Sequence, residues 1–153
     1  MAQIVNPRKE FNFSIQVVGA PINPFLVQDV TISEISIAQV KHGDTNFDVK
    51  TAGRVDVGEL ELEKIMSTSG ADNYFMNWAF SCQDMIIGGG LTPNKYKRSL
   101  IVQELAEDGK SVINQWLLEG CWPTKINGQK LSRKGTDNSV EKVTMSVDRF
   151  EKV

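Results

Sequence analysis

Apolar and polar residues alternate along most of this chain, which is the pattern of β-strands with one buried face. The alternation is clear at residues 11–17, 59–63 and 140–150, and the last segment places Val143 and Met145 on one face. Because successive side chains of a strand point to opposite faces, these segments predict an amphipathic sheet.

The alternation changes parity midway through the second strand region. Val30 and Ile32 lie on one parity, whereas Ile35 and Ile37 lie on the other. A one-residue shift moves every following side chain to the opposite face, so one regular strand cannot hold both halves. We therefore predict a β-bulge or sharp bend near residues 33–34.

One segment has helical periodicity instead. Apolar residues recur at spacings of three and four between residues 72 and 87, which predicts one amphipathic helix. Its apolar stripe comprises Tyr74, Phe75, Trp78, Cys82, Met85 and Ile86. The glycine run at residues 88–90 would end this helix, since glycine readily takes the left-handed conformation. A phosphate-binding loop would precede its helix, so the run does not predict one.

Strand patterns return in the C-terminal half. Asp108-Gly109 separates two strand-like runs, residues 98–105 and 111–119, and Asp-Gly in this setting predicts a hairpin. The chain has no repeat and no linker that would divide it. We therefore predict a single domain over residues 1–153, mainly β, built as an antiparallel barrel or sandwich with one flanking helix.

The three tryptophans are predicted to lie in the core. Trp78 belongs to the helical stripe, and Trp116 and Trp122 share the parity of Leu118. The alternative is that Trp116 and Trp122 stack a bound ligand, which would make the protein a ligand-binding β-barrel.

Two polar features are candidates for contact with other molecules. Residues 41–54 show little periodicity and predict a long polar loop, and loops beyond about 12 residues are often functional. We expect this loop to act as a contact arm through Lys41, His42, Asp44, Asn46, Asp48, Lys50 and Arg54. The second feature is an acidic row, Glu59, Glu61 and Glu63, opposite the inward-facing Leu60 and Leu62. Its plain interpretation is a solvated outer face.

Composition and motifs argue against several function classes. The 153 residues carry a net charge of −2, which gives no general attraction to nucleic acid. His42, Cys82 and Cys121 lack the spacing of a metal site, and His42 has no triad motif around it. No secretory signal and no apolar run near 18 residues is visible. We expect no catalysis, no cofactor, no metal and no stable membrane association.

The order of segments resembles the tail-tube protein family of contractile phages, R-type bacteriocins and extracellular contractile injection systems. The segments that carry the resemblance are residues 6–7 and 11–15, residues 41–43, residues 58–64, the Trp78 helix, residues 97–102, Asp108-Gly109, Trp116, and Cys121-Trp122-Pro123-Thr124-Lys125 with the final strand. They span residues 6 to 150.

The resemblance implies hexameric rings stacked into a hollow tube. Residues 41–54 would contact the adjacent subunit and the next ring, and Glu59, Glu61 and Glu63 would face the lumen, where acidic groups let DNA pass without adsorbing. The implied partners are copies of the chain, a tail sheath, baseplate and terminator proteins, and passing DNA or protein cargo. The implied location is a virion tail or injection particle, assembled in the host bacterial cytoplasm. A baseplate tube initiator or a type VI ring protein is the alternative within the same fold.

Overall fold

The structure, a computed structural model, describes residues 12–18, 27–43, 46–65, 74–127, 131–135 and 139–153. Antiparallel strands dominate it, as predicted. The elements are β1 (Phe13–Val17), β2 (Val27–Thr31), β3 (Ile35–Gly43), β4 (Asp48–Val57), β5 (Leu60–Ile65), α1 (Tyr74–Cys82), α2 (Pro93–Tyr96), β6 (Arg98–Leu105), β7 (Val112–Ile126), β8 (Val140–Ser146) and β9 (Arg149–Lys152).

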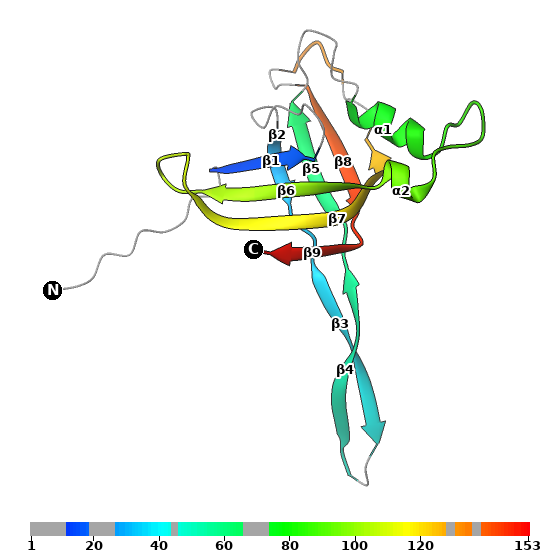
Figure 1. Cartoon of the computed structure of the whole chain (residues 1–153), viewed down its shortest axis with the longest axis vertical. Coiled ribbons are helices and arrows are strands. Elements are labelled where there is room, and N and C mark those ends of the chain that lie inside the picture. The colour runs from blue at the N-terminus through cyan, green and yellow to red at the C-terminus, as the bar shows by residue number, and fades with distance from the viewer. Residues whose placement is uncertain (1–11, 19–26, 44–45, 66–73, 128–130, 136–138) are drawn as a thin grey trace, which may run out of the picture.

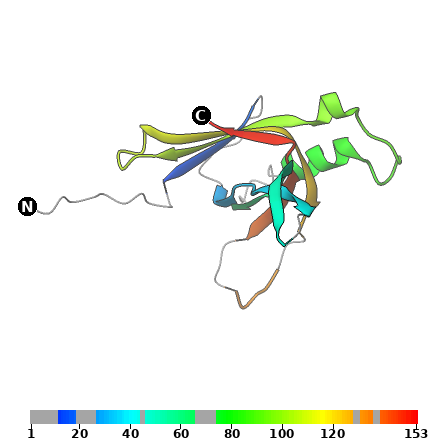
Figure 2. The same cartoon turned by 90° about the horizontal axis from the view of Figure 1, so that it is seen from below.

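Apart from β3 and β4, which form a two-stranded sheet of their own, the strands form two layers that share β7. In the described residues the sheet order is β1-β6-β7-β8-β5-β2, and β9 also pairs with β7. The first half of β7 pairs with β6 and β9, whereas its second half pairs with β8. The first layer, β1-β6-β7-β9, therefore crosses the second layer, β2-β5-β8 with the end of β7 (Figure 1). Helices α1 and α2 lie together at one end, beside the bend in β7 (Figure 2).

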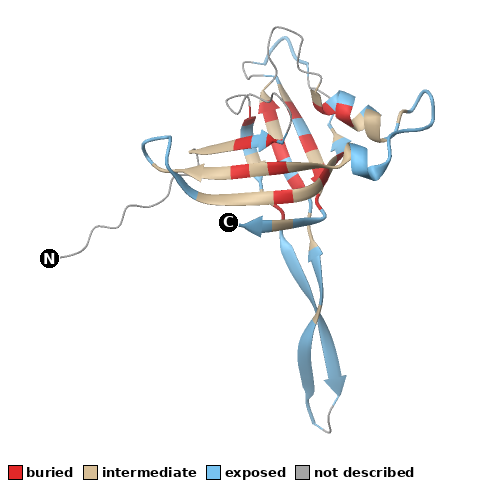
Figure 3. Ribbon diagram, viewed as in Figure 1, coloured by how far each residue is buried: buried red, intermediate tan, exposed pale blue. Residues whose placement is uncertain are grey.

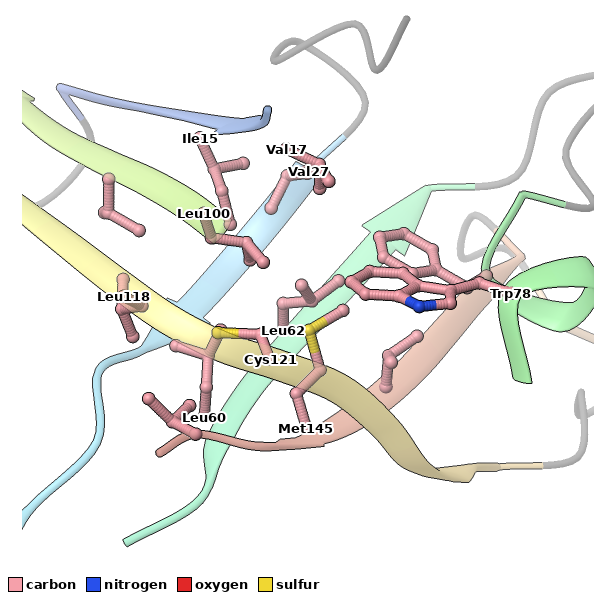
Figure 4. Packing of buried hydrophobic residues seen from close by; sticks show 14 residues of the cluster. Ile15, Val17, Val27, Leu60, Leu62, Trp78, Leu100, Leu118, Cys121 and Met145 are labelled. Atoms are coloured by element: carbon pink, nitrogen blue, oxygen red, sulfur yellow. The ribbon is translucent and has the colours of Figure 1, made fainter. Parts of the chain in front are cut away.

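The core lies between the two layers and is closed by α1. Leu60 and Leu62 of β5, and Val143 and Met145 of β8, are buried as their parity predicts. Leu118 and Cys121 of β7 face them across the core together with Trp78 of α1 (Figure 4). Burying large apolar side chains in this way contributes about 1.5–3 kcal/mol for each one.

The predicted helix is too long. Residues 72–73 lie outside the described part, and α1 ends at Cys82. Beyond it the Asp84 carboxylate accepts hydrogen bonds from the backbone N–H groups of Ile86 and Ile87, at 2.8 and 3.2 Å. This local turn competes with helical bonding. Met85 and Ile86 are consequently exposed and do not extend the buried stripe. A second short helix, α2, begins at a proline and was not predicted.

The prediction of a long polar loop at residues 41–54 is also wrong. Apart from residues 44–45, which are not described, and a bend at 46–47, this segment is strand and belongs to the antiparallel hairpin of β3 and β4. Both faces of the hairpin are largely exposed (Figure 3), so no buried face imposes the alternation by which strands are recognised.

The irregularity predicted near residues 33–34 is confirmed as the break between β2 and β3, where the chain leaves the sheet.

Two of the three tryptophans lie in or against the core as predicted, and the third does not. Trp78 is 2% exposed and lies in the core, and Trp116 is half-buried and packs against the core. Trp122 is not a core residue; its ring meets Tyr96 of α2 edge-on, with centroids 5.9 Å apart. The reason is Gly120, whose φ of +68° interrupts the strand and changes the parity between Leu118 and Trp122.

Candidate interaction surfaces

The hairpin of β3 and β4, here called the arm, extends away from the two layers (Figure 1). Near its base, Ile35 pairs with Val57 and Ile37 pairs with Val55. Ile37 and Val55 remain 55% and 61% exposed. A solvent-facing row of β-branched residues on an isolated hairpin is typical of a surface that another molecule covers.

The charged residues predicted for the contact loop lie along the outer part of the arm. Lys41 is opposite Lys50, and Asp48 is opposite Gly43. The His42 Nε2 and Thr51 Oγ1 atoms are 3.3 Å apart. Asn46 lies in the bend, Arg54 lies closer to the base, and Asp44 falls outside the described residues.

The acidic row lies on the face of the second layer that points away from the core. Glu61 and Glu63 belong to β5, and Glu59 directly precedes that strand. Glu63 is opposite Asp29 of β2 on one side and Lys142 of β8 on the other. A shallow hollow of about 320 Å³ on this face is lined by Asp29, Thr31, Glu61, Leu62, Glu63, Lys125, Asn127, Lys142, Val143 and Thr144.

This face is therefore mixed in charge. The residues that line the hollow carry three carboxylates, on Asp29, Glu61 and Glu63, and two amines, on Lys125 and Lys142. The lysines come from strands about 60 to 80 residues away in sequence, so only the strand register reveals them. Neither Trp116 nor Trp122 lines the hollow, which gives no support to a tryptophan-lined ligand pocket.

Sequence reasoning also missed the contacts that hold α1 against the sheets. The Arg98 guanidinium lies over the rings of Tyr74 and Trp78, 5.5 and 5.0 Å from their centroids, and donates a hydrogen bond to the Tyr74 hydroxyl. The Trp78 Nε1–H donates to the Tyr96 carbonyl at 2.6 Å. These contacts satisfy the polar edge of a buried tryptophan.

An apolar tip forms the connection between α1 and α2. Met85, Ile86 and Ile87 are 77%, 91% and 84% exposed. The turn that presents them is fixed by backbone hydrogen bonds from Gly88 N–H to the Asp84 carbonyl and from Asp84 N–H to the Gly89 carbonyl, both 2.8 Å. Apolar groups exposed together on a fixed turn are typical of a surface that another molecule covers.

The described residues offer no metal centre, since no group of three or more His, Cys, Asp or Glu side chains among them could hold an ion. None of the helices in the described ranges is long and apolar enough to span a bilayer.

The two cysteines are expected to be poorly reactive. Burial raises the pKa of the Cys121 thiol to about 12, and the nearby Asp148 carboxylate acts in the same direction. Burial also raises the pKa of Cys82. A raised pKa keeps the thiol protonated until the pH approaches that value, and only the thiolate reacts.

We expect iodoacetamide at pH 8 to modify Cys121 at least roughly a hundredfold more slowly in native protein than in urea. Mass spectrometry of timed samples measures this, and equal rates would contradict it.

The chain matches known proteins in sequence and in fold. The sequence matches the family of T4-like virus tail tube proteins (gp19) over residues 9–151. The tail tube protein gp19 of Enterobacteria phage T4 is 27% identical over 145 residues, covering 92% of this chain and 82% of that protein. The resemblance inferred from the order of segments is thereby confirmed.

Solved structures confirm the fold class. A chain of the sheath–tube complex of PVC, an extracellular contractile injection system in its extended state, superposes with a TM-score of 0.78 at 17% identity, covering 96% of this chain and 91% of that one. A chain of the PVC sheath/tube terminator superposes with a TM-score of 0.80 at 16% identity, and 99% of each chain is covered.

Proposed function

Because the chain belongs to the family of T4-like virus tail tube proteins, we propose that it is the major inner-tube subunit of a contractile phage tail or related injection particle. Six copies form a ring, and rings stack into a hollow tube. The observation that carries this role is the arm, whose apolar base is exposed in the single subunit. A second copy is the partner that covers such a surface in a self-assembling tube.

Ring closure is supported by the edges of the second layer. In the described part of the chain, the outer edge of β2 and the outer edge of the second half of β7 pair with no other strand. Unpaired edges are available for strand pairing between chains. Pairing β2 of one subunit with β7 of the next would join the second layers into a continuous barrel and leave no open edge.

In this arrangement the mixed-charge face of Asp29, Glu61, Glu63, Lys125 and Lys142 lines the lumen. Its carboxylates outnumber its amines by one, and a polar wall without a strong positive field does not retain a passing polyanion. The conduit therefore carries DNA or protein cargo without binding it specifically.

The proposed role is mechanical and involves no reaction. A sheath of another protein surrounds the tube and contracts, and the rigid tube is driven through the target envelope. Baseplate and terminator proteins hold its two ends, and the particle is assembled in the bacterial cytoplasm. Strand pairing between subunits makes the assembled state more stable than the free subunit, because a partner that binds only the folded chain stabilises the folded chain.

Electron microscopy of the purified protein over a range of concentrations tests this role. Tubes of uniform diameter that lengthen with concentration are the expected result. Single rings that never lengthen would instead indicate a baseplate initiator or a ring protein of the type VI kind. A monomer at every concentration, with tryptophan fluorescence that responds to a small molecule, would contradict the tube and favour the ligand-binding barrel.

A double substitution on the arm separates assembly from folding. Ile37→Thr/Val55→Thr keeps β-branched side chains but removes apolar surface from the base of the arm. Because both side chains are more than half exposed, we expect the melting temperature of the subunit to change by no more than about 2 °C. Loss of the apolar contact should raise the concentration needed for assembly about tenfold or more.

Val112→Thr/Ile113→Thr is the matched control for the arm. These apolar residues are both 46% exposed but lie at the start of β7, away from the arm. Light scattering should show normal assembly for the control. Equal assembly by both variants would contradict the proposed role of the arm.

A further inference from the structure

Charge is divided between the two halves of the second layer. Asp29 of β2 and Glu63 of β5 are opposite each other, so two carboxylates meet beside the β2 edge. Lys125 of β7 and Lys142 of β8 line the hollow on the same face, beside the β7 edge. The third carboxylate of the hollow, on Glu61, also belongs to β5. The face is therefore acidic toward β2 and basic toward β7.

The outermost charge at each edge has no partner within the described part of the subunit. Asp29 and Lys125 are both exposed, and neither side chain forms an ion pair with another described residue. Asp29 lies opposite a like charge, Glu63, and like charges directly opposite each other are unfavourable. Lys125 lies opposite the uncharged Thr144. Each edge therefore carries an unpaired charge, and the two charges are opposite in sign.

The backbone alone does not determine which edges join. Each strand of the second layer is antiparallel to the next, so β2 and the second half of β7 run in opposite directions. Joining β7 of one subunit to β2 of another continues the antiparallel pattern. Joining two β2 edges, or two β7 edges, about a twofold axis is antiparallel as well. Only the first kind of contact keeps every subunit pointing the same way along the tube axis.

We propose that Asp29 and Lys125 form a charge pair across the seam between neighbouring subunits of a ring, and that this pair selects the β2-to-β7 contact. The inference rests on the proposed tube function and specifies the chemistry of its ring-closing contact. In a β2-to-β7 seam the acidic half of one layer meets the basic half of the next. In the like-edge contacts Asp29 would meet Asp29, or Lys125 would meet Lys125, and like charges suppress such wrong pairings.

A second copy of the chain presents the two charges within reach of each other. The strand register places Lys125 in one row across the layer with Thr144, Glu61 and Thr31. Asp29 lies two residues from Thr31 and lines the same hollow. A long side chain reaches the diagonal neighbour on the next strand as well as the residue directly opposite. The pair is therefore diagonal when the two layers join level, and direct when they are displaced by two residues.

Charge reversal at each edge tests the pair. Asp29→Lys and Lys125→Glu, purified separately, should each need about tenfold or more protein than the parent to form rings, because like charges then face each other at every seam. An equimolar mixture should assemble at the concentration of the parent. In alternating order the two altered edges meet each other and the two native edges meet each other, so opposite charges face at every seam of a six-membered ring. The doubly substituted chain should also assemble normally.

Glu107→Lys and Lys110→Glu are the matched controls. They make the same changes of charge at exposed positions in the β6–β7 turn, far from both edges of the second layer (Figure 1), and should assemble as the parent does. Sedimentation velocity and negative-stain microscopy measure ring formation. The melting temperatures of the free subunits should match, because Asp29 and Lys125 are exposed and Asp29→Lys removes a like-charge contact with Glu63.

The outcomes distinguish the charge pair from the tube itself. Normal ring formation by both single variants would overturn the pair while the tube function stands. Impaired single variants that neither the mixture nor the doubly substituted chain restores would overturn it too, since the two charges would then not face each other. An equal defect in the controls would assign the effect to net charge, with the same consequence. A parent protein that forms no rings at any concentration would reject the tube function, and the pair with it.

Discussion

Replacing Gly120 with alanine is expected to destabilise the folded subunit by about 2–5 kcal/mol. Gly120 has a φ of +68°, a left-handed conformation that costs other residues roughly 1–2 kcal/mol. A Cβ atom here would also lie 2.2 Å from Asp148 Oδ2 and 2.7 Å from Asp148 Cβ. Relieving that overlap requires the turn after β8 to move, and overpacking of this kind typically costs about 1–3 kcal/mol more.

Gly109 provides the matched control. Its φ is +71°, but a Cβ there would meet nothing within 4 Å. Gly109→Ala therefore carries the backbone cost alone, roughly 1–2 kcal/mol. Urea denaturation of both variants, in the Ile37→Thr/Val55→Thr background to suppress assembly, measures the difference. Equal losses would show that Asp148 moves freely and that contact with Gly120 does not hold the bend of β7.

The contact of Asp148 with Gly120 also explains why the bend could not be predicted from the sequence. Asp148 follows β8, and its Oδ2 atom accepts a hydrogen bond at 2.8 Å from Lys97, which directly precedes β6. Three segments distant in sequence therefore meet at one glycine. The alternation of Leu118 and Trp122 taken alone predicts a straight strand, and the parity change appears only when Gly120 is seen to be left-handed.

Buried strands were predictable because burial imposes a pattern that the sequence displays. Leu60 and Leu62 must face the core, so their spacing reveals β5. The arm lacks that constraint. Lys41 and Lys50 are opposite each other across an exposed ladder, and neither face of the hairpin is buried within the subunit. A strand with both faces exposed therefore resembles a polar loop in a single sequence.

On the candidate lumen face, too, residues close in sequence could be predicted to lie together, whereas residues distant in sequence could not. The spacing of Glu61 and Glu63 shows that they share a face, and the structure agrees. The spacing says nothing of Lys142, which lies opposite Glu63 only through the register of β5 and β8. The sequence therefore predicted an acidic row, whereas the assembled sheet presents a mixed surface.

Trp78→Ala is expected to produce the largest loss of stability in the subunit. Trp78 is 2% exposed, and its ring stacks on Phe75 with centroids 6.4 Å apart, at an interplanar angle of 22°. It joins α1 to both layers (Figure 4). Truncating a buried tryptophan to alanine typically costs about 3–5 kcal/mol, because apolar burial is lost and a cavity remains. For a subunit of this size that lowers the melting temperature by roughly 6–20 °C.

Trp78→Phe separates packing from hydrogen bonding in this loss. Phenylalanine retains an aromatic ring between Phe75 and Arg98 but cannot donate to the Tyr96 carbonyl, now 2.6 Å from Trp78 Nε1. The Tyr96 carbonyl is part-buried, and leaving such an acceptor without its donor costs about 1–3 kcal/mol. We therefore expect Trp78→Phe to unfold, in calorimetry and urea titration, between the parent and Trp78→Ala. A Phe variant as unstable as the Ala variant would mean that anchoring of α2 through this hydrogen bond dominates. An Ala variant as stable as the parent would mean that α1 does not close the core.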